Sequence, residues 1–232
     1  MEIFIDSANM AEIEKWLGMG VIDGVTTNPS IMLKDKVYDI EKRAKEIAAL
    51  INPRPLSVEV TTNDLNEMLT QAREFATWAK NIVVKIPQET QDGTPCYGVM
   101  HQLENEGIKV NATAALSLGQ VILAAKAGAT YISIFAGRVS DEGGNTFEII
   151  ANSVEWLERW QLKSKILVGS IRSVGDVLQS ALAGAHTVTI PPEFISKMAD
   201  HKYTRETVRQ FVNDASKTLE MMKKVRRDKK EQ

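Results

Sequence analysis

Short apolar runs alternate with longer amphipathic segments along the whole chain. The short runs are rich in β-branched residues and predict eight strands, at residues 2–6, 21–26, 56–60, 82–86, 108–113, 131–135, 165–169 and 186–190. Between them apolar residues recur every three to four positions, which predicts helices that include 10–18, 65–80, 118–129, 146–160 and 174–185. Four glycines are expected to end helices before the next strand: Gly18, Gly107, Gly128 and Gly184.

This alternation predicts an α/β fold in which parallel strands are joined by helical crossovers. About eight such units, at about 30 residues each, match the size of a (β/α)8 barrel, the TIM barrel. An open doubly wound sheet is the competing fold. Such a sheet usually carries a glycine-rich phosphate turn after its first strand, where this chain reads DSANM. We therefore predict the barrel.

A long amphipathic segment follows the last predicted strand. Residues 204–224, TRETVRQFVNDASKTLEMMKK, predict an extra C-terminal helix. No linker or change of composition divides the chain, so we expect one barrel domain over 1–222 that includes this helix. The remaining residues, 223–232, form a charged tail, which is expected to be a solvated terminus rather than a nucleic-acid-binding arm.

Composition narrows the class of protein. The 232 residues carry 28 basic and 30 acidic side chains, so no overall field favours nucleic acid or an anionic membrane. Cys96 is the only cysteine, which excludes a disulfide framework or a cysteine-based zinc site within one chain. The start of the chain lacks the pattern of a signal peptide, and no apolar run is long enough to span a membrane. We expect a cytoplasmic protein that binds neither nucleic acid nor membrane.

The three histidines, His101, His186 and His201, show no metal-ligand spacing and no carboxylate cluster around them. A mononuclear metal hydrolase and a metal site are therefore not expected.

Polar residues interrupt the apolar strands at regular places. Side chains of a strand alternate between two faces, so Lys85 shares a face with Val83, and Asp6 shares one with Phe4. In a barrel one face packs on the helices, whereas the other points inside, and the C-terminal strand ends build the active site. Six residues are therefore predicted to converge on one mouth: Asp6, Glu59, Lys85, Thr113, Ser133 and Ser170. The alternative, a scattered set of rim residues, would not explain two carboxylates and a lysine within apolar strands.

Lys85 lies in the run IVVKI, where an ammonium ion is costly to bury. Burial favours the neutral amine, which can attack a carbonyl and form an iminium that serves as an electron sink. Asp6 and Glu59 would then transfer protons. The alternative is a buried ion pair that only holds the barrel together; the surrounding polar set favours the nucleophile.

Arg138 and Arg172 follow the strands at 131–135 and 165–169. Late loops of a barrel commonly hold phosphate, and the guanidinium fork suits that group. The pair therefore predicts a phosphorylated substrate.

Several stretches carry a family resemblance. They are GVTTNPS (24–30), IVVKIP (82–87), AGATYISIFAGR (127–138) and GSIR (169–172), with EIFIDSAN at the start and VTIPPEF near the end. Together they resemble the transaldolase family, in the short form that it shares with fructose-6-phosphate aldolases, over essentially the whole chain. The resemblance implies a class I aldolase barrel that acts on sugar phosphates without a metal or organic cofactor.

The resemblance also implies a role for each polar residue. Lys85 would form the Schiff base, and Asp6 would be the acid/base that handles the sugar hydroxyl during bond cleavage. Glu59 and Thr113 would position a catalytic water during iminium formation. The implied substrate contacts are Asn28 and Ser133 with the hydroxyls of a dihydroxyacetone unit, Arg138, Arg172 and Ser170 with the phosphate, and Thr26 with the wall of the site.

Glu59 and Phe135 favour the transaldolase branch, because the aldolases of this family carry glutamine and tyrosine at those places. The implied reaction moves a dihydroxyacetone unit from sedoheptulose 7-phosphate to glyceraldehyde 3-phosphate, giving erythrose 4-phosphate and fructose 6-phosphate in the pentose phosphate pathway. A fructose-6-phosphate aldolase, or a transferase for an unusual ketose, is the alternative. A non-catalytic barrel or assembly protein is the alternative from another class.

Some positions depart from the family pattern. Ile134 stands where the family usually has proline, and the segment 88–98, which contains Cys96, is longer than the usual connection. No catalytic residue is lost, so these departures leave open the exact sugar more than the chemistry, and Cys96 is expected to be a bystander. Short members of the family form rings, so the resemblance implies a homo-oligomer, a ring-shaped pentamer or decamer.

Overall fold

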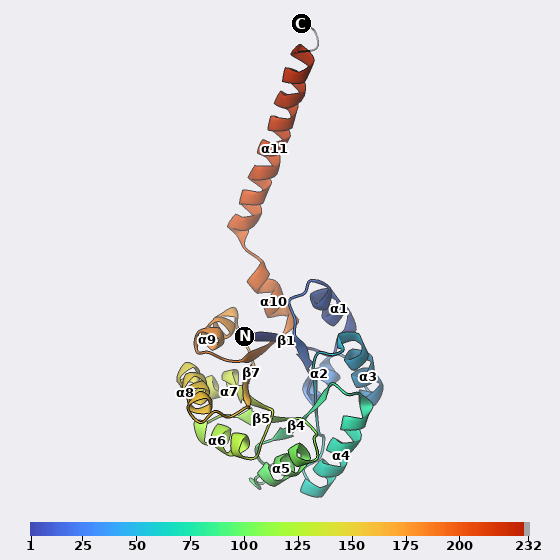
Figure 1. Ribbon diagram of the computed structural model, residues 1–232, viewed down its shortest axis with the longest axis vertical. Coiled ribbons are helices and arrows are strands. Elements are labelled where there is room, and N and C mark those ends of the chain that lie inside the picture. The colour runs from blue at the N-terminus through green and yellow to red at the C-terminus, as the bar shows by residue number, and fades with distance from the viewer. Residues whose placement is uncertain (230–232) are drawn as a thin grey trace. The chain divides into compact units, whose positions relative to one another are not determined.

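Eight parallel strands close into a barrel in which the strand order follows the chain and β8 pairs with β1. The structure is a computed structural model that describes residues 1–229, so the last three residues of the predicted charged tail lie outside the described residues. The strands are β1 (Glu2–Asp6), β2 (Gly24–Thr26), β3 (Leu56–Glu59), β4 (Ile82–Pro87), β5 (Val110–Ala115), β6 (Tyr131–Phe135), β7 (Lys165–Gly169) and β8 (Thr187–Ile190). The predicted (β/α)8 barrel is confirmed, and Figure 1 shows its helices as a ring around the strands.

The chain forms the helices expected from the periodicity and further ones of 6–12 residues, and the last two described helices follow β8 instead of connecting strands. They are α1 (Met10–Gly18), α2 (Pro29–Lys34), α3 (Ile40–Ile51), α4 (Leu65–Trp78), α5 (Tyr97–Asn105), α6 (Leu118–Lys126), α7 (Ala136–Asp141), α8 (Thr146–Arg159), α9 (Val174–Leu182), α10 (Pro192–Ala199) and α11 (Lys202–Asp228). Gly107, Gly128 and Gly184 have the positive φ expected after a helix. Gly18 is instead the last residue of α1, and the positive φ falls on Gly20.

Strand β2 is shorter than expected and begins only at Gly24. The preceding Asp23 turns back to β1, where its backbone N–H donates to the Ile3 carbonyl and its carboxylate accepts from the Ile3 N–H. Gly24 itself is required by packing, because a Cβ there would lie 2.7 Å from the ring of Phe4. This ring fills the barrel interior beside the missing side chain.

An apolar cluster fills part of the barrel interior. Phe4, Val83, Tyr131 and Leu167 form one buried cluster, with the Phe4 and Tyr131 rings in edge contact at 5.9 Å between centroids. Because side chains alternate, the inward positions one step nearer the C-terminal strand ends lie two residues farther along. Those positions are Asp6, Lys85, Ser133 and Gly169. This apolar cluster therefore lies beneath a polar mouth.

The described chain divides into two units, Met1–Phe194, which holds the barrel, and the residues from Ile195 onward. Helix α11 is the predicted extra C-terminal helix, and none of its residues is buried. Its exposed apolar side chains include Val208, Phe211, Val212, Leu219 and Met222. Among residues 1–229, no helix combines the length and apolar content that a membrane span requires. The single domain expected over 1–222 stays a prediction.

Candidate active site

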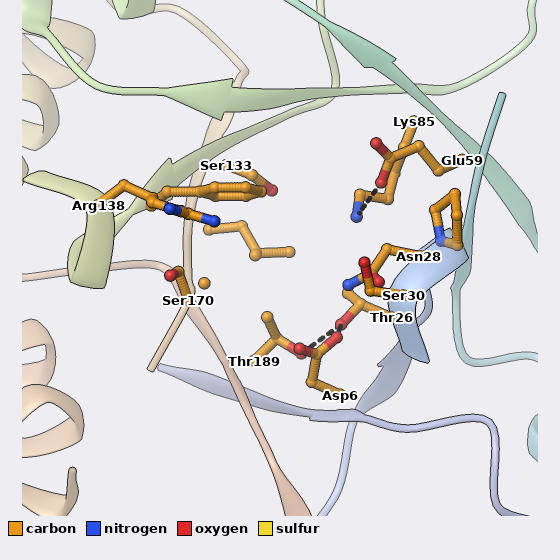
Figure 2. A pocket seen from close by; sticks show the side chains of 14 residues that line it. Asp6, Thr26, Asn28, Ser30, Glu59, Lys85, Ser133, Arg138, Ser170 and Thr189 are labelled. Atoms are coloured by element: carbon orange, nitrogen blue, oxygen red, sulfur yellow. Dashed lines mark hydrogen bonds and ion pairs between the residues drawn. The ribbon is translucent and has the colours of Figure 1, made fainter. Parts of the chain in front are cut away.

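A cavity of about 400 Å³ opens where the strands end at their C-terminal side. Its volume falls in the usual range of small-molecule sites. The lining residues are Asp6, Thr26, Asn28, Pro29, Ser30, Glu59, Lys85, Ser133, Phe135, Arg138, Leu167, Gly169, Ser170 and Thr189 (Figure 2). The structure thus brings together the site residues expected from sequence, except Thr113 and Arg172.

Lys85 reaches the cavity from β4 and is held by a neighbouring carboxylate. Its Nζ lies 2.8 Å from Glu59 Oε2 and donates to the Thr27 carbonyl at 3.1 Å. Glu59 and Lys85 are register partners on β3 and β4, which fixes their proximity. The Lys85 side chain is only 5% exposed, against 23% for Glu59. The amine is therefore buried, and a proton acceptor is within hydrogen-bond distance.

Asp6 is the last residue of β1 and lines the same cavity. Its carboxyl group belongs to a row of hydrogen bonds with two threonine hydroxyls. Its Oδ1 accepts from Thr26 Oγ1 at 2.6 Å, and Thr26 Oγ1 lies 2.5 Å from Thr189 Oγ1 (Figure 2). Burial raises the pKa of the Asp6 carboxyl, whereas the Lys85 charge and the bond from Thr26 oppose that rise. A carboxyl with a raised pKa can both take up and return a proton near neutrality better than an ordinary aspartate.

Ser133 and Asn28 place further polar groups on the cavity wall. Ser133 Oγ donates to Asn111 Oδ1 at 2.7 Å, and Asn111 Nδ2 donates to Ser57 Oγ at 3.3 Å. These two buried hydrogen bonds link β6, β5 and β3. Asn28 caps α2, since its Oδ1 accepts from the Ile31 N–H at 2.9 Å. These bonds leave the oxygen of Ser133 able to accept and the amide N–H groups of Asn28 able to donate to a ligand.

Thr113 lies on β5 and is completely buried, but it does not line the cavity. Its Oγ1 has no hydrogen-bond partner among the described residues. The strand register shifts between Ala112 and Ala115, and Ala114 takes a left-handed φ of 60°. A buried hydroxyl without a partner is costly, and an ordered water is the usual partner of such a group.

The two predicted arginines are placed differently. Arg138, at the start of α7, lines the cavity, and Figure 2 shows it with Ser170 on the side opposite Lys85. Arg172 lies outside the lining and pairs with Asp141 through both guanidinium ends, with Nη2 2.7 Å from Oδ2. The Arg172 guanidinium holds the pKa of Asp141 below its ordinary value. In this conformation the fork of Arg172 is turned to a carboxylate of the protein.

The start of α7, which carries Arg138, packs closely at Gly137 on the loop after β7, which carries Arg172. A Cβ at Gly137 would lie 2.6 Å from both the Ser170 carbonyl oxygen and Arg172 Nε. Gly137 N–H also donates to that carbonyl at 3.0 Å, and Ser170 adopts a φ of 58°. The positive φ is strained for serine and is held by this contact.

The lining residues not predicted from sequence are Pro29, Ser30, Leu167, Gly169 and Thr189. Thr189 carried a usable signal, because alternation along TVTI places Thr187 and Thr189 on one face, as it does for the other strands. Ser30 lies two residues after Asn28, in the first turn of α2, so proximity along the chain also pointed to it.

Cys96 does not line the cavity. Cys96 is buried, its Sγ lies 4.0 Å from Met68 Sδ, and burial raises the pKa of its thiol to about 11. Over residues 1–229, no group of three or more His, Cys, Asp or Glu side chains is arranged to hold a metal ion. The reactive groups of the described cavity are thus an amine, carboxyls, hydroxyls and a guanidinium.

Solved structures with similar shape show the fold of the chain. A mandelate oxidase mutant matches 82% of this chain and 64% of its own, with a TM-score of 0.57 at 15% identity. A thiamine phosphate pyrophosphorylase from Pyrococcus furiosus matches 82% of this chain and 85% of its own, with a TM-score of 0.56 at 12% identity. At such low identity these likenesses concern the barrel alone.

Sequence relatives are much closer. A probable transaldolase of Lactiplantibacillus plantarum is 41% identical over 214 residues, which is 92% of this chain and 96% of the relative. A probable transaldolase of Petrotoga mobilis is 40% identical over 223 residues, which is 96% of this chain and 98% of the relative. The family model described as Transaldolase/Fructose-6-phosphate aldolase matches residues 3–232. The chain therefore belongs to the transaldolase/fructose-6-phosphate aldolase family.

Proposed function

We propose that this protein is a transaldolase that moves a dihydroxyacetone unit between sugar phosphates through a Schiff base on Lys85. The observation that carries the proposal is the buried Lys85 amine, 2.8 Å from Glu59, on a cavity that Asp6 also lines. The names of the relatives, probable transaldolases, support the same activity.

In the proposed reaction, Schiff-base formation begins with proton transfer from the Lys85 ammonium to Glu59. The neutral amine attacks the C2 carbonyl of the ketose phosphate, and the resulting carbinolamine loses its hydroxyl as water, which leaves an iminium. A water bound between Glu59 and the unpaired Thr113 hydroxyl would relay the protons of this step.

Asp6 then acts on the bond to be broken. Its carboxylate accepts the proton of the C4 hydroxyl, the C3–C4 bond breaks, and an aldose phosphate leaves. The electron pair of that bond enters the iminium and forms an enamine on Lys85. An incoming aldehyde is attacked by the enamine carbon, Asp6 returns its proton to the new alkoxide, and hydrolysis of the iminium releases the product ketose.

The substrate phosphate is assigned to the side of the cavity opposite Lys85, where Arg138 and Ser170 lie. An extended sugar phosphate would then place its carbonyl at the amine and its phosphate at the guanidinium. Arg172 would join this contact by exchanging the Asp141 carboxylate for the phosphate, since both groups fit the same fork.

Product analysis with fructose 6-phosphate, with and without erythrose 4-phosphate, tests the reaction. Sedoheptulose 7-phosphate formed only with the acceptor, and little free dihydroxyacetone without it, is the expected result. Free dihydroxyacetone in the absence of acceptor would make the protein an aldolase. It would also show that Glu59 and Phe135 do not distinguish the transaldolase branch from the aldolase branch. If borohydride with the ketose phosphate leaves Lys85 unmodified, the Schiff base is wrong and the pair with Glu59 is structural.

We also propose a homo-oligomer, a ring of five subunits or a doubled ring of ten. The exposed apolar side chains of α11 support it, because such a row is normally covered by protein. Light scattering on the full chain measures the mass, and a monomer at micromolar concentration would contradict the proposal. The cytoplasmic location and the place in the pentose phosphate pathway stay predictions.

A further inference from the structure

Three neighbouring strands place a continuous row of oxygen atoms at one wall of the cavity. In the register of the barrel, Asp6 on β1 is the partner of Thr26 on β2, and Thr189 on β8 pairs with Phe4. Thr26 and Thr189 are 2% and 4% exposed. Asp6 Oδ1, Thr26 Oγ1 and Thr189 Oγ1 follow one another at 2.6 Å and 2.5 Å (Figure 2).

The number of hydroxyl protons available determines which group donates in each hydrogen bond of this row. An ionised carboxylate only accepts, so Thr26 must use its single hydroxyl proton on Asp6. The short contact between Thr26 and Thr189 then requires the proton of Thr189. When Asp6 takes up a proton, the row can reverse, with the acid donating to Thr26 and Thr26 donating to Thr189. Among residues 1–229, neither hydroxyl has another hydrogen-bond partner.

We propose that Thr189 is a positioning residue, whose hydroxyl acts through Thr26 to hold Asp6 in the orientation and charge state required for proton transfer. The proposal rests on the function proposed above, since it assigns Asp6 the role of acid/base. Thr189 donates to Thr26 while Asp6 is a carboxylate, and accepts from Thr26 after Asp6 has taken the substrate proton. A chain of hydrogen bonds strengthens each of its members, so losing the outer hydroxyl weakens the bond that reaches Asp6.

The charged groups around Asp6 act in opposite directions on its carboxylate, so the contribution of the Thr189 hydroxyl counts. Lys85 from β4 favours the carboxylate, whereas Glu59 from β3 and Glu193 from α10 oppose it. Burial also opposes the charged form and is the largest effect. The row of hydroxyls is the uncharged contribution that favours the carboxylate.

Thr189→Val tests the proposal because valine keeps the shape of threonine and removes only the hydrogen bond between Thr189 and Thr26. The first measurement is the titration of the Asp6 carboxyl by carbon NMR on protein labelled at aspartate, with Asp6→Asn to assign the signal. We expect Thr189→Val to raise the Asp6 midpoint by about half a pH unit, and Thr189→Ser to restore the wild-type value. The acid limb of kcat/KM for the ketose phosphate should move by the same amount.

Thr187→Val is the matched control on the same strand. Thr187 is also buried, but its hydroxyl donates to Glu2 at 3.0 Å, at the other end of the barrel. Thr187→Val should leave both the Asp6 midpoint and the acid limb of kcat/KM unchanged.

If Thr189→Val does not fold, Thr189→Ala takes its place, with the same midpoint shift expected. An unchanged Asp6 midpoint, or a serine variant that behaves like valine, overturns the proposal. The NMR titration needs no turnover, so it decides the role of Thr189 even if the transaldolase assignment fails.

Discussion

Replacing Lys85 with methionine distinguishes a catalytic lysine from a purely structural ion pair. The substitution removes the amine but keeps an unbranched apolar side chain, so the barrel interior stays filled. If Lys85 forms the Schiff base, cleavage of fructose 6-phosphate falls to background and borohydride no longer attaches the sugar to the protein. The assays are product formation and the mass of the reduced protein.

The expected loss of stability follows from the groups that remain. Removing one partner of a fully buried ion pair costs about 3–5 kcal/mol, because the other charge stays unpaired. Glu59 keeps 23% of its side chain exposed, so cavity water can solvate it and the cost falls below that range. The Thr27 carbonyl loses one hydrogen bond, worth about 1 kcal/mol. We therefore expect the unfolding free energy to fall by about 1–3 kcal/mol and Tm by about 2–12 °C.

Lys165 provides the matched control. Its Nζ lies 2.7 Å from Glu2 Oε1 where β7 and β1 begin, and both side chains are exposed to solvent. Lys165→Met should cost less than about 1 kcal/mol and leave turnover and trapping unchanged. The reasoning is refuted if Lys85→Met keeps wild-type turnover. It is also refuted if that variant loses more than about 5 kcal/mol, since the barrel would then depend on the pair itself.

Four further predictions concern separate groups of the site and its surroundings. Thr113→Val should leave the unfolding free energy unchanged or raise it by about 1 kcal/mol, because the hydroxyl lacks a partner, while kcat falls at least about tenfold; a drop in stability with normal kcat would contradict this. Arg138→Gln should raise KM about 10–100-fold for phosphorylated sugars and leave unphosphorylated ones unaffected, as expected for one lost charge-assisted bond; equal effects on both would exclude a phosphate contact. Asp6 must be ionised to accept a proton and burial raises its pKa, so kcat/KM should fall as pH drops through a midpoint above about 4, the value of an exposed aspartate. The buried thiol of Cys96, with a pKa of about 11, should react with iodoacetamide at pH 8 only after unfolding; rapid labelling of the folded protein would argue against this.

Much of the fold and of the site was predictable because two periodicities carry the information. Apolar runs marked the strands, and alternation within them placed Asp6, Glu59 and Lys85 on the interior side. The structure brings these three residues to one cavity. The same rule applied to β8 would have added Thr189.

The remaining features depend on contacts that no local pattern contains. The pairing of Arg172 with Asp141 joins residues 31 positions apart, and it lies beside the close contact between α7 and the loop after β7 at Gly137. The register shift in β5 and the left-handed Ala114 follow from how that strand meets β6. A pattern of period two cannot show an irregularity of this kind, so the buried, unpaired state of Thr113 could not be foreseen.

The closed strand order has a consequence for how such an enzyme can diversify. The groups assigned to bond making, Asp6, Glu59 and Lys85, belong to the first four strands, whereas Arg138 and Ser170 follow β6 and β7. Under the proposed assignment, mutation in the segments after β6 and β7 would alter which sugar is accepted without disturbing the chemistry. Ile134, which departs from the family pattern, lies on that later side. The segments after β6 and β7 can thus change with the substrate while the strands that carry the proposed chemistry are kept.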